Sequence, residues 1–137
     1  MAEQQKIEYS QLEAGYTFPP ASYDLAPAMV SKYIKAVGET SSLYQGTDLV
    51  PPTAIAAYAL AVLSEGISLP DGSIHVSQGL EFLGTLNIGD TITCRAEVSQ
   101  KKERRRMHLL NIDLTVFDQR ARLVMKGKTS FILPESD

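Results

Sequence analysis

The sequence has no tryptophan, one cysteine and two histidines among its 137 residues. The single cysteine, Cys94, forms no internal disulfide, and so few thiol and imidazole groups make a poor zinc site, so we expect no metal. Charged residues are sparse at 21%, and thirteen basic against sixteen acidic residues give a net charge of −3. This balance is too acidic for a general nucleic-acid-binding protein.

Long apolar segments are also lacking. The longest stretch without a charged residue runs from Leu49 to Ser64, which is shorter than the about 20 residues that a membrane span needs. The first residues, Met-Ala-Glu-Gln-Gln-Lys, have no apolar stretch behind them, so we expect no secretory signal. With the single cysteine, these features predict a cytoplasmic protein without a membrane span.

The length and composition are those of one globular domain. A chain of 137 residues buries enough surface to form a core without disulfides or metals. The apolar fraction of 44% is ordinary for a soluble globule, and it excludes wholesale disorder. Because the sequence contains no internal repeat, we expect a single domain over residues 1–137.

Two helices are predicted in the first half of the chain. Apolar residues recur at helical spacing between Met29 and Val37, and Gly38 follows as a helix stop. A second helix is expected from about Pro52 to Glu65, with Gly66 as its stop. No charge lies on any of its faces before Glu65, a pattern typical of a helix that is surrounded by protein.

The hydrophobic period changes to two in the second half of the chain. Alternating apolar and polar side chains predict strands over 74–82, 92–98, 110–116 and 123–133, with a basic loop at 101–106. Two helices followed by long antiparallel strands indicate an α+β fold. Because the second helix has no polar face, we expect the sheet to curl around it.

Four stretches in this order resemble the MaoC-like dehydratase and hydratase family, whose fold is the hotdog. They are Tyr33-Ile-Lys-Ala-Val-Gly38-Glu39, Leu49-Val-Pro-Pro-Thr53, Ile74-His75-Val-Ser-Gln78-Gly-Leu-Glu81-Phe82 and Leu86-Asn-Ile-Gly89-Asp90. The resemblance extends from about Gly15 to Leu133 and is closest to the amino-terminal, fatty-acid-synthase-type dehydratase half. It implies a lyase domain that adds water to, or removes it from, an acyl thioester of coenzyme A or acyl carrier protein.

The sequence departs from the family at the catalytic dyad. Active hydratases of the family carry Gly-Asp-x-Asn-Pro-x-His directly after the first helix. Here Glu39 stands at the aspartate position and Tyr44 at the histidine position, with the spacing kept. Histidine titrates near pH 6.5 and suits proton transfer at neutral pH, whereas tyrosine, near 10, is a poor base. Glutamate is one methylene longer than aspartate, and a misplacement of about 1 Å can cost on the order of 100-fold in rate.

These substitutions favour an acyl-thioester-binding subunit that is non-catalytic or depends on a partner. The alternative is an active hydratase or dehydratase in which Glu39, Tyr44 or His75 carries the proton transfers. His75 begins a predicted strand, where a histidine paired with a neighbouring polar group is the more common finding. A hotdog thioesterase with a carboxylate on the central helix is disfavoured, because no acid lies between Leu49 and Ser64.

Two further segments are candidates for binding the thioester. Pro52, Thr53 and Ala54 begin the second helix, and free N–H groups there would suit a thioester oxygen, although proline also starts many helices without a ligand. Five of the six residues from Lys101 to Arg106 are basic. Arg104, Arg105 and Arg106 would suit the phosphates of coenzyme A, although a solvated hairpin tip is the more common role of such a run.

The resemblance also implies a partner. A lone hotdog leaves a sheet edge and half of a pocket exposed, so we expect a homodimer, or a heterodimer with a catalytic MaoC-like hotdog. We expect no cofactor beyond the acyl-CoA or acyl carrier protein thioester itself, and no nucleic acid.

Overall fold

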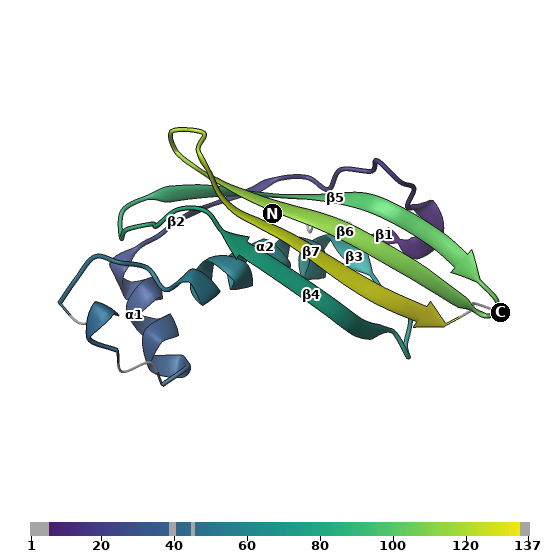
Figure 1. Cartoon of the computed structure of the whole chain (residues 1–137), viewed down its shortest axis with the longest axis horizontal. Helices are drawn as coiled ribbons and strands as arrows, with labels where there is room; N and C mark the ends of the chain where they lie inside the picture. The colour runs from purple at the N-terminus through teal and green to yellow at the C-terminus, as the bar shows by residue number, and fades with distance from the viewer. Residues whose placement is uncertain (1–5, 39–40, 45, 135–137) are drawn as a thin grey trace.

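A computed structural model of the chain describes residues 6–38, 41–44 and 46–134. A five-stranded antiparallel sheet in the order β2-β5-β6-β7-β4 dominates it, and one long helix, α2, lies against one face of this sheet (Figure 1). This is the predicted α+β layout. The elements in chain order are β1 (Ile7–Glu8), η1 (Tyr9–Gln11), β2 (Ala21–Asp24), α1 (Pro27–Ala36), η2 (Ser42–Tyr44), α2 (Pro52–Gly66), β3 (Ile67–Ser68), β4 (Ile74–Phe82), β5 (Thr91–Arg104), β6 (Met107–Asp118) and β7 (Leu123–Pro134).

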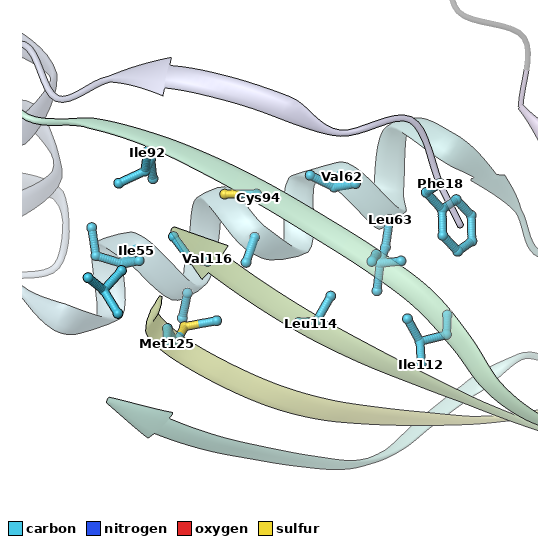
Figure 2. Packing of buried hydrophobic residues seen from close by; sticks show 14 of the residues in the cluster. Phe18, Ile55, Val62, Leu63, Ile92, Cys94, Ile112, Leu114, Val116 and Met125 are labelled. Atoms are coloured by element: carbon cyan, nitrogen blue, oxygen red, sulfur yellow. The ribbon is translucent and has the colours of Figure 1, made fainter. Parts of the chain in front are cut away.

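The core lies between α2 and the inward faces of β5, β6 and β7 (Figure 2). The period of two predicted for these strands is confirmed, because alternate residues are buried along them. The inward residues of β5 and β6 are Ile92, Cys94, Ala96, Val98, Leu110, Ile112, Leu114 and Val116, all at most 1% exposed. Burial of this apolar surface is the main force that holds the helix on the sheet.

The two glycines predicted as helix stops have different roles. Gly38 has a φ of 69° directly after the C-cap of α1, so it ends that helix in the left-handed conformation as predicted. Gly66 is instead the last residue of α2. A Cβ atom at Gly66 would lie 3.0 Å from a ring carbon of Phe18. The missing side chain therefore allows Phe18 to approach the helix.

The expectation that protein surrounds α2 on every side is not met within the described chain. Thr53, Ala57 and Ser64 form an exposed stripe along the helix, and Leu60 and Ala61 beside them are only half-buried. The cause is that α2 packs chiefly on β5 and β6. An exposed alanine leaves little apolar area in water, so this stripe costs little stability.

The basic segment is mostly strand, and the prediction of a loop over 101–106 is wrong. Pairing between β5 and β6 continues up to Arg104 opposite Met107. Only Arg105 and Arg106 connect the strands, and Arg105 has a φ of 58°, as two-residue hairpin connections often require. Regular ladder hydrogen bonds outweigh the charge repulsion along this segment.

Within the part of the chain that the structure describes, no helix is both long and apolar enough to cross a membrane. Across the same residues, no three histidine, cysteine, aspartate or glutamate side chains come together as potential metal ligands.

Cys94 is fully buried on the inward face of β5, and burial raises the pKa of its thiol to about 12. The thiolate is the reactive form of cysteine. We therefore expect no reaction of the native protein with Ellman's reagent near pH 8, and one equivalent of thiol released after unfolding in urea. A fast reaction of the folded chain would contradict the buried position of this strand.

The turn between β6 and β7 is built around a buried carboxylate. Asp118 accepts hydrogen bonds from the backbone N–H groups of Arg120 and Arg122, both at 2.9 Å, and from Nε of Arg122 at 2.7 Å. These hydrogen bonds, that from the Arg122 backbone first, lower the pKa of Asp118 from its usual value near 3.8. The charged form of Asp118 therefore stabilises the folded state.

Because the pKa of Asp118 is lower in the folded than in the unfolded chain, its contribution to stability is present above about pH 4 and is lost as the pH falls through the lowered value. We expect Asp118→Asn to lower the urea midpoint at pH 7, with the difference from wild type shrinking towards pH 3. Asp71→Asn, at an exposed position, is the control and should change the midpoint little. A pH-independent deficit in Asp118→Asn would mean that the charge of this carboxylate does not matter.

Candidate functional site

The start of α2 is fixed by the turn that follows β4. The N–H of Val50 donates to the carbonyl of Leu86 at 2.9 Å, and the N–H of Ile88 donates to the carbonyl of Asp48 at 2.7 Å. These bonds position Pro51 and Pro52, which begin the helix without a side-chain cap. The motif residues 49–53 and 86–90, distant in sequence, are thus neighbours in space.

Tyr44 lies beside the start of α2. Its N–H donates to the carbonyl of Ser41 at 3.1 Å in the short helix η2. The half-buried side chain lines a small cavity of about 70 Å³ together with Pro52, Ile55 and Phe82. Its proposed companion, Glu39, lies outside the described residues.

The structure distinguishes the two amides proposed to bind a thioester oxygen. The N–H of Ala54 donates to the carbonyl of Pro51 at 3.0 Å, and Ala54 is only 3% exposed. The expectation that its N–H is free is therefore wrong, because the first turn of the helix uses it. Thr53 is exposed, and its hydroxyl accepts a hydrogen bond of 2.7 Å from the hydroxyl of Tyr33 on α1. Thr53 is the polar residue that remains accessible at the helix start.

A cavity of about 280 Å³ separates α1 from the first half of α2. Its walls are mainly apolar, with Met29, Tyr33, Ala57 and Tyr58 among them. The hydroxyl of Tyr58 contacts Sδ of Met29 at 3.9 Å, and burial raises its pKa above the usual value of 10. Tyr58 therefore stays protonated at neutral pH and does not act as a base.

His75, on β4, lines a separate cavity of about 330 Å³ beside the second half of α2. Its Nε2 hydrogen-bonds the hydroxyl of the buried Thr129 at 2.5 Å, and its ring stacks on Phe131 with centroids 4.7 Å apart. The cavity is lined by Leu60, Leu63, Ser64, Ile67, Leu69, His75, Gln78 and Phe131.

A β-bulge places Gln78 in the same cavity as His75. In a regular strand two residues three apart point to opposite faces. The register of β4 shifts between His75 and Ser77, so that His75 faces Phe131 and Gln78 faces Thr129, two inward residues of β7. The sequence contains both polar residues but gives no signal for the bulge, and its alternation predicts Thr129 and Phe131 only as strand residues.

The structure does not bring Tyr44 and His75 together. The Tyr44 cavity is lined by Ile55 of α2, and the His75 cavity by Leu60 and Leu63. Along the helix Ile55 is roughly 8 Å from Leu60 and roughly 12 Å from Leu63. Along β4, Phe82 of the Tyr44 cavity lies seven residues after His75, roughly 20 Å at the rise of a strand. One protomer therefore does not present both side chains to the same reacting atom.

Arg104, Arg105 and Arg106 are exposed at the tip of the β5–β6 hairpin, at the opposite end of the sheet from the start of α2 (Figure 1). The length of β5, on the order of 40 Å, separates this tip from Thr53. Lys101, in the same basic segment, is engaged in hydrogen bonds within the fold. Its Nζ donates to the carbonyls of Tyr9 and Leu12 at 3.1 and 2.8 Å.

The chain matches a family model and shares its fold with solved structures. Residues 13–127 match the family model described as FAS1-like, dehydratase domain region. No curated protein sequence matches the chain.

Several solved structures share the fold at low sequence identity. The (R)-hydratase from A. caviae involved in PHA biosynthesis is 21% identical over 90% of this chain and 98% of its own, with a TM-score of 0.75. The MaoC-like dehydratase from Rhodospirillum rubrum is 14% identical over 94% of this chain and 97% of its own, with a TM-score of 0.71. The HadBC (3R-hydroxyacyl-ACP dehydratase) complex from Mycobacterium tuberculosis contains a chain 17% identical over 87% of this chain and 96% of its own, with a TM-score of 0.68.

These matches confirm the hotdog fold and the resemblance that the four sequence stretches indicate. The family model covers residues 13–127, nearly the whole of the chain. The chain belongs to the FAS1-like dehydratase domain region, within the MaoC-like hotdog family of dehydratases and hydratases.

Proposed function

We propose that this chain binds acyl thioesters and has no hydratase or dehydratase activity by itself. The observation that carries the proposal is the replacement of the expected aspartate and histidine by Glu39 and Tyr44, together with the separation of Tyr44 from His75. It acts in fatty acid metabolism in the cytoplasm, as a binding subunit that needs no cofactor beyond its thioester ligand.

The reaction of the family needs a base for water, an acid for the α-carbon and a donor for the developing enolate oxygen. In this chain the start of α2 supplies a donor group at Thr53, next to two cavities. A phenol at the histidine position is a poor proton acceptor near neutral pH. The parts that bind and polarise a thioester are therefore better represented than the parts that move a proton.

The isolated chain should bind a saturated acyl-CoA in calorimetry and leave the absorbance of a 2-enoyl-CoA unchanged. The double variant Glu39→Asp/Tyr44→His should then hydrate the enoyl-CoA at least about 100-fold faster than wild type, since a positioned base contributes 100-fold or more. Tyr44→Phe removes only a hydroxyl and is the matched control, which should stay inactive.

Two outcomes would overturn this proposal. Turnover by the wild-type chain that is lost in Glu39→Gln would mean that the altered dyad is catalytic. A folded chain that binds no acyl-CoA would mean that the site is not a thioester site.

The partner surface we propose is the edge strand β4. Among the described strands, β4 pairs with β7 on one side and with none on the other, and all nine of its residues are exposed. Ile74, Val76, Leu80 and Phe82 make it strongly apolar, and Glu81 is its only acidic or basic residue apart from His75. Free edges usually carry lysine, proline or a short strand that prevents pairing.

The opposite edge of the sheet has that protection. Strand β2 contains only four residues, Ala21–Asp24, and Pro19 and Pro20 precede it. We propose that β4 pairs with β4 of a second copy in a symmetric, antiparallel contact. The inward side of β4 borders the His75 cavity, so the second copy also covers that cavity.

The wild-type chain should have the mass of a dimer in light scattering. Ile74→Lys/Val76→Lys replaces two apolar side chains of the edge by lysines, which oppose strand pairing, so we expect dimer dissociation at least about 100-fold more favourable. Val37→Lys/Met107→Lys adds the same charge at other exposed apolar positions and should remain dimeric. A wild-type monomer, or a β4 variant that stays dimeric, would refute the contact. A stable mixed dimer with a hydratase chain would mean that the hydratase chain, and not a second copy, is the partner of β4.

A further inference from the structure

The cavity at the second half of α2 combines apolar walls with two polar groups. Leu60, Leu63, Ile67, Leu69 and Phe131 supply apolar surface, while His75 and Gln78 enter from β4. Pockets with this composition orient a mostly apolar ligand through a few placed polar atoms.

The two polar groups face the cavity because of an irregularity in the backbone of β4. Without the bulge between His75 and Ser77, only one of the two side chains would face the cavity. Bulges that re-aim a side chain in this way are common next to functional sites.

His75 is held in one orientation. Its Nε2 is engaged by Thr129, which is fully buried, and its ring lies on Phe131 with an angle of 25° between the planes. Thr129 stands between Gly127 and Phe131 on the inward side of β7. Because Nε2 is engaged within the protein, Nδ1 is the ring nitrogen left to meet a ligand.

The exposed stripe of α2 leads from the helix start to this cavity. Thr53 lies at the start, Ala57 lines the cavity beside α1, and Leu60 and Ser64 line the His75 cavity. From Thr53 to the region of Leu60 and Ser64 the helix rises roughly 10 to 16 Å, the span of an acyl chain of about eight to twelve carbons.

We infer that the acyl chain bound here carries a hydrogen-bonding group, such as a hydroxyl or keto oxygen, near its distal end, and that His75 and Gln78 recognise it. This inference rests on the proposed function, because it places the thioester at Thr53. A site built to hydrogen-bond a ligand hydroxyl discriminates against the analogue that lacks it, since its polar groups are then left unpaired.

The test compares ω-hydroxyacyl-CoAs with plain acyl-CoAs of the same length, about eight to twelve carbons, by calorimetry on the full chain. We expect the hydroxylated ligand to bind about 10-fold more tightly at the best length. In His75→Phe/Gln78→Leu this preference should disappear, with the affinity for the plain acyl-CoA kept within about 3-fold. Ser77→Ala, on the same strand but facing outward, should keep the preference.

The outcomes separate this inference from the one on which it rests. Equal binding of both ligands by the wild-type chain overturns the recognition of a distal polar group but leaves thioester binding intact. Binding of neither ligand overturns the proposed function. A preference that persists in the double variant assigns recognition to other residues, and Gln78→Leu alone supplies this test if the double variant does not fold.

Discussion

Close packing between small side chains of α2 and β5 determines the arrangement of the rest of the molecule. Ala54 and Ala59 of the helix and Cys94 and Ala96 of the strand are all buried, and α2 packs chiefly on β5 and β6. Small side chains allow a helix to lie close to a sheet at interior packing density. Because α2 packs against β5 and β6, it does not cover the inward face of β4. The cavity that contains His75 results from this offset of the helix toward β5.

The same offset divides the chemistry between the two ends of α2. One end holds Thr53, Tyr44 and the turn after β4, and the other holds His75 and Gln78. A hydratase needs its proton-transfer groups within hydrogen-bond reach of one bound atom. Because these groups are separated along the helix, the arrangement supports the proposal that the chain binds a long ligand and does not itself transfer protons.

Most of the fold could be predicted from the sequence, because hydrophobic period and helix signals are local. The uncharged run before Glu65 identified the central helix, and alternation identified β5, β6 and β7. The residue roles that the sequence did not predict depend on contacts between residues that are distant in sequence. Gly66 accommodates Phe18, Lys101 ties down the segment at Tyr9, and the bulge after His75 arises from pairing with β7. Neither composition nor spacing reports such contacts, so the candidate site could be placed only in part.

The unequal edges of the sheet also set a limit on how far strand pairing can extend. A sheet with two open edges can add neighbours at both sides, and its growth has no natural end. Among the strands that the structure describes, β2 is protected by its short length and by the two prolines before it, and β4 is the edge left open to pairing. Pairing of β4 with a second copy, as proposed, would end strand addition at two chains and would leave no apolar edge strand free for fibre growth.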